Sequence, residues 1–416
     1  MRDAYLVGAG QSSFGSFPDE TYRSLFETAF ERALDGADAL NPARIEEVHL
    51  GTLGVGGRQL GLSAPAVTEH VGLHDVPTTR VENACAASAY ALRGAVRAVR
   101  AGAVDVALAG GYEVMTDTSA DRTKWWLGVS GETEWERTAG TTFAGVYAQM
   151  ARAHIDEYGT TVEDLARVTV KNHANGAKNP NAHLGFECSV EDARSAPAVA
   201  DPLNLYHCCP TSDGASAVLV ASEDVARELR AGDPERAGQA DDAAPLVRVA
   251  GVGAASGRVG LFQRDTFTSI PASVTAAERA YDAAGIGPED VDVAEVHDCF
   301  AIAELLAYED LGFCAPGKSG KLLREGVTDP DGALPANTSG GLKSKGHPIG
   351  ATGTGQIAEL SAQLRGEAHV QVSSPEIGLA HNVGGSGGGV AVTILERVDG
   401  GARADGGSRG REGDER

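Results

Sequence analysis

The sequence ERALD at residues 31–35 returns as ERAYD at residues 278–282, and EVH at residues 47–49 returns as EVH at residues 295–297. Each copy is typical of a helix, then a turn that contains proline, and then a strand. The two copies are about 250 residues apart, and this spacing is too long for the repeat unit of a solenoid. We therefore expect two similar halves that pack against each other.

The pattern around this repeat indicates the fold class of each half. The apolar run at residues 104–109 has the length of a strand, and it follows the helical pattern of residues 86–100. Apolar runs of strand length that alternate with longer helical patterns favour an α/β fold with layered sheets.

Composition divides the chain further. Residues 117–200 interrupt the alternation of strands and helices and carry all three tryptophans, so we interpret them as an inserted loop domain. The polar segment 228–245 is rich in Ala, Gly and Asp, which predicts an exposed linker. We expect an N-terminal half at 1–245, a C-terminal half at 246–397, and a disordered tail at 398–416, where apolar residues are nearly absent.

The charge of the chain excludes several classes of partner. Its 416 residues include 58 Asp and Glu against 35 Lys and Arg, and the resulting field repels nucleic acid and anionic membranes. Only seven of the basic residues are lysines. We interpret this composition as adaptation to high salt, where screening reduces the repulsion between like charges. An acidic enzyme of an ordinary cytosol is the alternative.

Cysteine usage and hydropathy indicate the compartment. Six cysteines occur, and they have neither CxxC spacing nor the density of a secreted disulfide framework. The first eight residues lead into a short apolar segment that is unlike the long apolar stretch of a signal peptide. No segment reaches the length of a membrane span. We expect a protein of the reducing cytoplasm that is not inserted into a membrane.

The first candidate for chemistry is Cys85, in the sequence NACAAS at residues 83–88. A helical run of small residues follows it and ends near Ala101, which would place Cys85 at a helix N-terminus. Unpaired backbone N–H groups and the helix dipole favour a thiolate there, and a thiolate is what a cysteine nucleophile requires. A lone cysteine is also often a small buried apolar side chain, so the spacing alone leaves both interpretations open.

A glycine-rich motif, GGLKSKGHPIGATG at residues 340–353, places His347 just before a predicted helix. His347 could take the proton of Cys85 and then donate a hydrogen bond to a thioester oxygen. Such a loop could otherwise hold a phosphate, but it lacks the GxGxxG spacing and no Walker lysine follows it. We therefore expect no nucleotide site.

Two shorter motifs add histidines and a second cysteine. HDCF at residues 297–300 contains His297 and Cys299 at the end of a predicted strand, and HNVGGSGGG at residues 381–389 begins with His381 before an apolar strand. Each histidine could be a hydrogen-bonded structural residue. These side chains could also suggest zinc, but structural zinc sites usually show ligands in close pairs, so we expect no metal.

The motifs NACAAS, HDCF, GHPIGATG and HNVGG occur in the order that is found in the thiolase superfamily, and the chain resembles that superfamily. Within it, the chain is similar to the sterol-carrier-protein-2-type and archaeal acetoacetyl-CoA thiolases. The resemblance extends from Tyr5 to Leu395. It implies a five-layer α-β-α-β-α arrangement of two similar halves, which agrees with the repeat. It also implies an acetyl-CoA C-acetyltransferase that binds acyl-CoA and CoA as substrates, holds no bound cofactor, and catalyses reversible condensation and thiolysis through acylated Cys85.

By the same resemblance, His347 is similar to the base that activates the nucleophile. His297 occupies a position where many thiolases have an asparagine that holds a water, so it resembles a contributor to the oxyanion hole. Many thiolases carry a second catalytic cysteine in a CxG motif, where this chain has His381 and Asn382. In sterol-carrier-type members the HDCF cysteine supplies that acid and base. By this resemblance, Cys299 is the leading candidate for the second acid and base. His381 could orient Cys299 or contribute to the oxyanion hole.

Two other functions stay open. A related ketoacyl or hydroxymethylglutaryl synthase is the enzymatic alternative, although decarboxylating synthases need no second proton-abstracting base such as Cys299. A non-catalytic acyl-CoA-binding subunit is the other, and the retention of Cys85 and His347 argues against it.

The resemblance also has implications for partners. It implies a homodimer or homotetramer and, for archaeal members, a complex with hydroxymethylglutaryl-CoA synthase and a small OB-fold protein. Supply of isoprenoid precursors through the mevalonate pathway, polyester synthesis and fatty-acid breakdown all stay open, as does the preferred acyl chain length.

Overall fold

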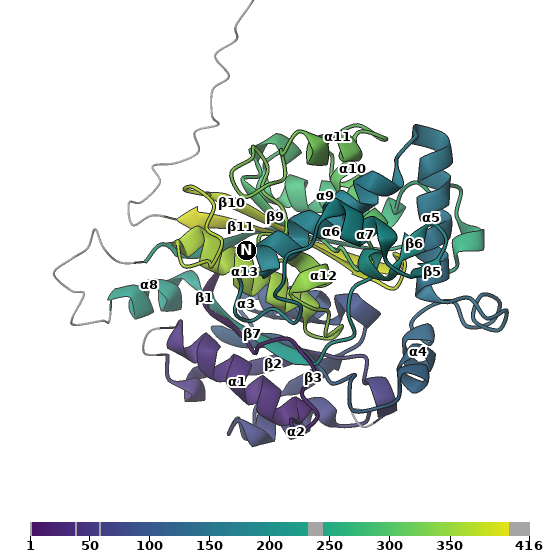
Figure 1. The fold of residues 1–416 in the computed structure, drawn as a ribbon. Coiled ribbons are helices and arrows are strands. Elements are labelled where there is room, and N and C mark those ends of the chain that lie inside the picture. Colours follow the sequence, from purple (N-terminus) through teal and green to yellow (C-terminus); the bar gives the residue numbers. More distant parts are fainter. Residues whose placement is uncertain (1, 38–39, 58–59, 232–243, 399–416) are drawn as a thin grey trace, which may run out of the picture.

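The computed structural model describes residues 2–37, 40–57, 60–231 and 244–398, and Figure 1 shows how its elements are arranged. Nine strands form one hydrogen-bonded sheet in the order β3-β2-β4-β7-β1-β8-β11-β10-β9. The strands of the first half of the chain lie on one side of the β1–β8 pair, and those of the second half lie on the other. In the described part of the chain, no helix is both long enough and apolar enough to cross a membrane.

The first half supplies five neighbouring strands, β1 (Ala4–Gln11), β2 (Glu47–Gly51), β3 (Thr78–Val81), β4 (Val106–Glu113) and β7 (Gly214–Ser222). β7 runs antiparallel to β1 and β4, whereas β2 runs parallel to β3 and β4. β4 and β7 are buried along their whole length, as expected of strands that are covered on both faces.

The second half repeats this arrangement with β8 (Leu246–Ser256), β9 (Val293–Glu295), β10 (Ile377–Gly384) and β11 (Gly389–Val398). β11 runs antiparallel to β8 and β10, and β10 runs parallel to β9. The order β8-β11-β10-β9 therefore matches β1-β7-β4-β2 strand for strand. ERALD and ERAYD lie in α1 (Tyr22–Asp35) and α9 (Pro271–Ala284). The expected pair of similar halves is confirmed.

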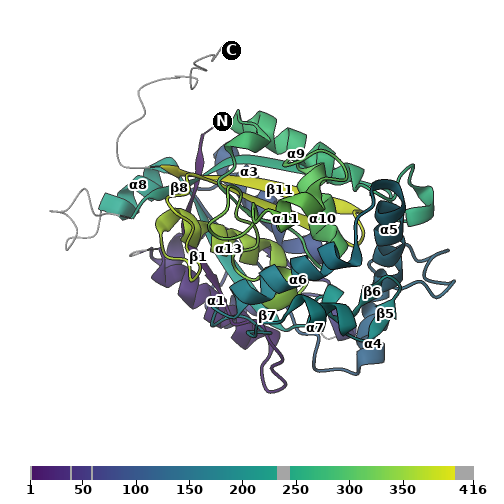
Figure 2. The same ribbon diagram turned by 45° about the horizontal axis from the view of Figure 1, so that its top comes forward.

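Helices form the layers on and between the two halves of the sheet. α3 (Ala87–Ala101) and α13 (Thr352–Arg365) lie in the middle, where their apolar side chains share one core with strands of both halves. α1 and α2 (Ser63–His70) pack on the outer face of the first half, and α9 and α10 (Ala301–Asp310) pack on that of the second, where Figure 2 shows them. The predicted five layers are confirmed.

The two halves of the sheet are not separate, because they are hydrogen-bonded to each other. A short antiparallel pairing of β1 with β8, at Tyr5 with Arg248 and Leu6 with Val247, joins the two halves into a continuous sheet. The sheet therefore packs on both sides of the same helix pair. The short helices α11 (Ser319–Arg324) and α12 (Gly341–Ser344) complete the second half.

A largely helical segment lies between β4 and β7, where the sequence predicts an inserted loop domain. Its elements are α4 (Ala120–Gly128), α5 (Phe143–Tyr158), α6 (Val162–Gly176), α7 (Val190–Ser195) and the two-stranded sheet of β5 (Ala198–Ala200) and β6 (Leu203–Asn204). Apolar side chains of α5 belong to the core of the second half. α5 therefore leaves the first half in sequence and packs on the second half in space.

The predicted linker at 228–245 is wrong at its start. Residues 228–231 belong to α8 (Glu223–Ala231), because Val225, Ala226 and Leu229 form one buried face. Residues 232–243 of the linker and residues 399–416 of the predicted tail lie outside the described residues. Val398, where the predicted tail begins, is the last residue of β11.

Candidate active site

Close backbone approach brings the start of α3 against two other elements. A Cβ on Gly51 of β2 would lie 2.4 Å from the nitrogen of Ser88, and one on Gly353 of α13 would lie 2.6 Å from the nitrogen of Ala89. Any larger residue at these positions would push the elements apart. Glycine therefore allows the first turn of α3, just after Cys85, to contact both halves of the molecule.

Cys85 lies in the 3₁₀ turn Ala84–Ala86 that leads into α3. Ala84 has φ of 49°, a left-handed conformation that a residue other than glycine adopts only when its surroundings enforce it. The N–H of Gly385, in the turn between β10 and β11, donates a hydrogen bond to the Cys85 sulfur. The half-buried thiol is thus held between the two halves of the chain.

The charge state of Cys85 differs from the expectation. Burial raises the pKa of its thiol to about 12, which outweighs the opposing effect of the Gly385 N–H, and the nearby carboxylates of Glu113 and Glu82 raise it further. The expectation of a thiolate at the helix N-terminus is therefore wrong for the free protein, because desolvation exceeds the stabilisation by backbone donors. A base must remove the thiol proton if Cys85 is to act as a nucleophile.

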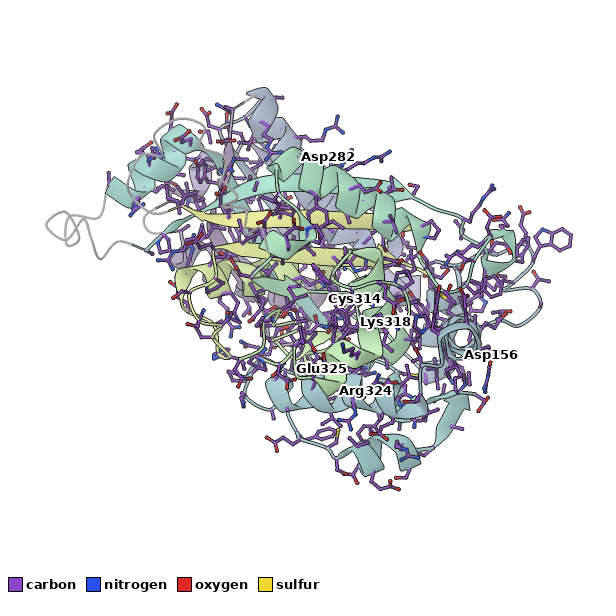
Figure 3. All side chains as sticks on the ribbon, turned by 90° about the horizontal axis from the view of Figure 1, so that it is seen from above. Asp156, Asp282, Cys314, Lys318, Arg324 and Glu325 are labelled. Atoms are coloured by element: carbon purple, nitrogen blue, oxygen red, sulfur yellow. The ribbon has the colours of Figure 1, made fainter. Side chains whose placement is uncertain are left out.

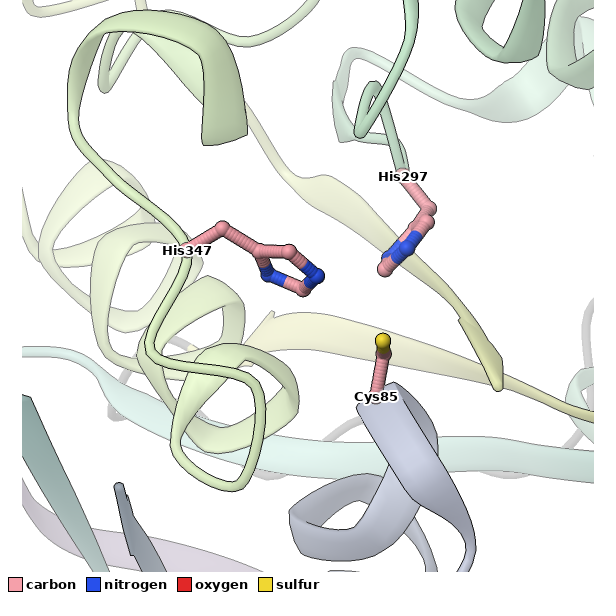
Figure 4. A group of neighbouring side chains, drawn as sticks. All are labelled: Cys85, His297 and His347. Atoms are coloured by element: carbon pink, nitrogen blue, oxygen red, sulfur yellow. The ribbon is translucent and has the colours of Figure 1, made fainter. Parts of the chain in front are cut away.

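His347 lies in the loop between α12 and α13 and faces Cys85, as Figure 4 shows. Its Nδ1 is 2.7 Å from Thr352 Oγ1, and that hydroxyl donates to the Pro348 oxygen at 3.1 Å. A hydroxyl has one proton, so Nδ1 must be the donor and Nε2 keeps its lone pair. Burial lowers the pKa of His347 to about 3. The neutral ring is therefore held in the tautomer whose Nε2 can accept a proton.

His297 completes a cluster with these two side chains. The Cys85 sulfur and one ring nitrogen each of His347 and His297 lie within 4.8 Å of one another. The two rings meet edge to face, with their centroids 5.1 Å apart. The predicted nucleophile, its predicted base and the predicted oxyanion-hole histidine are thus brought together.

The proton on His297 is also placed by a neighbour. The Asn382 amide nitrogen donates to His297 Nδ1 at 3.2 Å, so Nε2 carries the proton, and Nε2 has no hydrogen-bond partner within the described chain. Burial and, after it, repulsion between His297 and His347 or His381 when these rings are protonated hold the pKa of His297 well below its ordinary value. His297 is therefore a neutral N–H donor beside Cys85.

Cys299 borders the same cavity as Cys85 and His347. Burial raises the pKa of its thiol well above the ordinary value, and the neighbouring Cys209 and Cys85 act in the same direction. A hydrogen bond with the Tyr147 hydroxyl acts in the opposite direction. The second predicted cysteine therefore lies beside the first, and it is a neutral thiol in the free protein.

His381 does not line this cavity. On β10 its side chain points to α9, where Nε2 is 2.9 Å from the Ser273 hydroxyl. Asn382 follows it in the strand and points to the opposite face, toward His297. Burial lowers the pKa of His381 to about 3. His381 is therefore absent from the lining of the cavity, and Asn382, to which the motifs assign no role, lies beside the cluster.

The motifs assign no role to three side chains of the site, namely Asn382, Thr352 and Tyr147. The alternation of side chains along a strand could have identified Asn382, because His381 and Asn382 cannot face the same side. Thr352 lies within the glycine-rich motif, five residues after His347. Tyr147 comes from α5, and no pattern in the sequence connects it with the other residues.

The cavity beside Cys85 has a volume of about 130 Å³, and its lining is mostly apolar. Its lining includes Cys85, Met115, Leu127, Phe143, Tyr147, Cys299, Phe300 and His347. Trp126 and Leu127 also pack against a small apolar cluster next to Cys85. Cys314, labelled in Figure 3, lies in the segment between α10 and α11 and packs against the core of the second half.

The cluster of Cys85, His297 and His347 is also a group in the described chain that could hold a metal ion, since thiolate and imidazole are ligands of zinc. The Cys85 thiol and His297 Nε2 would each have to give up a proton to bind a metal. The absence of a metal from the working protein stays a prediction.

Comparison with known families identifies both halves. The family "Thiolase, N-terminal domain" matches residues 4–224, and the family "Thiolase C-terminal domain-like" matches residues 253–397. Acetyl-CoA acetyltransferases of Methanothermobacter thermautotrophicus and Methanocaldococcus jannaschii are 42% and 40% identical to this chain over 404 residues. These matches cover 95% of this chain and 100% and 99% of the two relatives. Human sterol carrier protein 2 is 32% identical, over 95% of this chain and 72% of its own length.

Solved structures show the same fold. The Ltp2-ChsH2(DUF35) aldolase superimposes with a TM-score of 0.80 at 25% identity, covering 95% of this chain and 98% of that one. Human mitochondrial 3-ketoacyl-CoA thiolase in complex with CoA superimposes with a TM-score of 0.74 at 19% identity, with the same coverage.

Proposed function

This chain belongs to the thiolase family and is an acyltransferase, and from this premise we propose that it is an acetyl-CoA C-acetyltransferase that forms an acyl-enzyme on Cys85. The observation that carries the proposal is the approach of the Cys85 sulfur and the ring nitrogens of His347 and His297 to within 4.8 Å, beside Cys299. Condensation of two thioesters requires a nucleophile, two sites of proton transfer and N–H donors for oxyanions. The archaeal relatives named acetyl-CoA acetyltransferase support the choice of substrate.

In the first step, the Cys85 sulfur attacks the thioester carbonyl of acetyl-CoA. His347 Nε2 takes the thiol proton, because Thr352 keeps that nitrogen unprotonated. The Gly385 N–H, which contacts the sulfur, can donate to the carbonyl oxygen as charge develops there. When the bond to the CoA sulfur breaks, Cys299 gives its proton to the departing thiolate. The products are acetylated Cys85, free CoA, a Cys299 thiolate and a His347 imidazolium.

In the second step, the Cys299 thiolate removes a proton from the methyl carbon of the next acetyl-CoA. Charge moves to the thioester oxygen, to which His297 and the His347 imidazolium donate hydrogen bonds. The enolate carbon attacks the acetyl carbonyl on Cys85, and acetoacetyl-CoA leaves. The released Cys85 sulfur recovers its proton from His347, so every group returns to its neutral form. Thiolysis follows the same steps in reverse.

The size of the cavity supports a short acyl group. Its volume of about 130 Å³ is smaller than the roughly 150 Å³ of an engineered cavity that holds benzene. Met115, Leu127 and Phe143 are among the side chains that limit it. An acetyl group fits such a space, whereas a chain of eight carbons requires these side chains to move.

The assignment of the second base has a direct test. We expect Cys299→Ala to slow the exchange of the methyl protons of acetyl-CoA with deuterated solvent by about 100-fold or more, because the thiolate that removes them is gone. His381→Ala removes a histidine outside the cavity and should change the exchange by less than about threefold. Nuclear magnetic resonance of acetyl-CoA measures both. Exchange that survives Cys299→Ala and is lost in His381→Ala would reverse the assignment.

We further propose that the protein works in the cytoplasm at high salt as a homodimer or homotetramer. The net charge of −23 supports a need for screening. We expect light scattering at molar salt to give the mass of a dimer or tetramer, and thermal unfolding to shift to a lower temperature at about 0.1 M salt. A monomer at molar salt would contradict the first expectation, and unfolding that is insensitive to salt would contradict the second.

We also propose that the chain joins a complex with a hydroxymethylglutaryl-CoA synthase and a small OB-fold protein, which would pass acetoacetyl-CoA on toward mevalonate. The similar structure named Ltp2-ChsH2(DUF35) aldolase supports the idea of a partner subunit. Co-purification of the chain with both partners at molar salt would test it, and their separate elution would contradict it.

A further inference from the structure

We propose that Tyr147 is a positioning residue for the condensation, whose hydroxyl donates in turn to the Gly385 carbonyl and to the Cys299 thiolate as Cys299 gains and loses its proton. This inference rests on the proposed role of Cys299 as the second base. Tyr147 comes from α5, in the helical segment between β4 and β7, so its part in the site arises only from the packing of α5 on the second half.

The position of Tyr147 is fixed by its ring. The side chain is fully buried, it lines the cavity, and its ring stacks on that of Phe300 with the centroids 4.6 Å apart. Its hydroxyl donates to the Gly385 oxygen at 3.0 Å and is also hydrogen-bonded to Cys299. One phenol oxygen therefore contacts the residue whose N–H donates to the Cys85 sulfur and the thiol that is the proposed second base.

The number of protons on this oxygen determines which hydrogen bonds can coexist. A phenol has one O–H. While that O–H donates to Gly385, the second hydrogen bond must have Cys299 as its donor, which requires the thiol form. A thiolate can only accept, so the Tyr147 O–H must then turn from Gly385 to the sulfur. Rotation about the bond between the ring and the oxygen accomplishes the exchange without movement of any heavy atom.

The exchange supplies a donor to Cys299 when its sulfur is charged. Much of the cavity lining is apolar, with Met115, Leu127 and Phe143 among its side chains, so a thiolate there lacks the donors that water would provide. A hydrogen bond from a buried hydroxyl to an ionised sulfur is of the stronger, charge-assisted kind. Tyr147 therefore favours the thiolate that removes the methyl proton of acetyl-CoA.

Other titratable and charged groups also act on Cys299, among them its neighbour in sequence, Asp298. Cys209, Cys85 and Asp298 oppose a charge on the sulfur, and the fully buried Lys343 of α12 favours it. Their effects act through space, whereas Tyr147 makes a hydrogen bond. Removal of the Tyr147 hydroxyl alone should therefore make the Cys299 thiolate less stable and leave the effects of these groups unchanged.

The turn that contains Gly385 has a second attachment. An Arg264 Nη donates to the Ser386 hydroxyl at 3.0 Å and also to its carbonyl oxygen. The turn therefore stays in place when Tyr147 releases Gly385. The Gly385 N–H remains available to Cys85 throughout the cycle.

The test is Tyr147→Phe, which keeps the ring on Phe300 and removes only the hydroxyl. We expect the rate of methyl-proton exchange of acetyl-CoA to fall about 10- to 100-fold, because the thiolate loses a charge-assisted hydrogen bond. The rising limb of this rate with pH should move to higher pH. Acetylation of Cys85, measured by mass spectrometry of the intact protein, should also slow, because Cys299 gives its proton to the departing CoA in that step, but the protein should still become acetylated.

Tyr281→Phe is the matched control. Tyr281 is another buried tyrosine, on α9, and it donates to the Leu311 oxygen at 2.9 Å. Its loss should leave the exchange rate and its pH profile unchanged. Equal exchange rates and pH profiles for Tyr147→Phe and Tyr281→Phe, in folded and acetylated proteins, would overturn the role of Tyr147. Exchange that survives in Cys299→Ala would instead overturn the proposed second base.

A second variant covers the case in which Tyr147→Phe does not fold. Incorporation of 3-fluorotyrosine at position 147 keeps the hydroxyl and makes it a stronger donor, because fluorine lowers the pKa of a phenol. The rising limb of the exchange rate should then move to lower pH, opposite to the effect of phenylalanine. An unchanged pH profile would show that the hydroxyl has only a structural role.

Discussion

Replacement of Cys85 by alanine is expected to abolish the acetyl adduct that forms when the protein is incubated with acetyl-CoA. It should also lower kcat/KM for acetoacetyl-CoA formation by at least about 10,000-fold. The sulfur is the atom that becomes acylated, so its loss closes the covalent route through which His347 and Cys299 act. Intact-protein mass spectrometry after incubation in high salt measures the adduct directly.

Cys314→Ala is the matched control for this change, because Cys314 does not line the cavity and packs against the core of the second half. It should retain the adduct. An adduct on Cys85→Ala would show that another residue is acylated. A folded wild-type protein that forms no adduct would favour the function of a non-catalytic acyl-CoA-binding subunit.

The same experiment tests the chain length. Octanoyl-CoA should acylate the wild-type protein at least about tenfold more slowly than acetyl-CoA, because the apolar cavity has little room beyond the thioester. Equal rates would contradict the preference for a short acyl group.

His347→Ala is expected to slow the acetylation of Cys85 by about 100- to 10,000-fold. Burial keeps the Cys85 thiol protonated, with a pKa of about 12, and this variant removes the nitrogen that accepts its proton. Mass spectrometry of samples quenched at successive times gives the rate. Thr352→Val, which removes the hydroxyl that holds the His347 tautomer, should slow the same step by a smaller factor of about 10.

The pH dependence of acetylation distinguishes this buried histidine from an ordinary one. Burial lowers the pKa of His347 to about 3, so the ring stays neutral and able to accept a proton as the pH falls. The rate in the wild-type protein should therefore be flat from about pH 8 to about pH 5, whereas an ordinary histidine would become protonated near pH 6.5. A fall centred near pH 6.5 in folded protein would contradict the assignment.

An exposed histidine provides the control for both measurements. His70 lies at the surface on α2, where it pairs with Glu27 at 3.0 Å. His70→Ala should acetylate at the wild-type rate and with the same pH profile. If it is as slow as His347→Ala, the loss in His347→Ala does not come from the proposed base.

The sequence was sufficient to predict the two halves and the meeting of the main motifs. ERALD and ERAYD mark equivalent helices because each half uses the same packing of one helix on its sheet. Cys85 and His347 come together because the glycines and alanines around them allow α3 and α13 to touch. These properties depend on local side-chain size and spacing, which a sequence displays directly.

The structure decided what each side chain of those motifs does. His381 and Asn382 are adjacent in sequence, but strand geometry sends one to α9 and the other to His297. The helix N-terminus at Cys85 predicts a thiolate, yet burial in the cavity leaves a neutral thiol.

The sequence by itself therefore determined the fold class, the repeat and the residues Cys85, His347, His297 and Cys299 as candidates. Only the tertiary structure decided their protonation, the exclusion of His381 from the cavity and the inclusion of Tyr147. The physical reason is that pKa values and hydrogen bonds depend on burial and on neighbours more than 100 residues away in sequence, such as Gly385 for Tyr147. Local patterns contain no information about such neighbours.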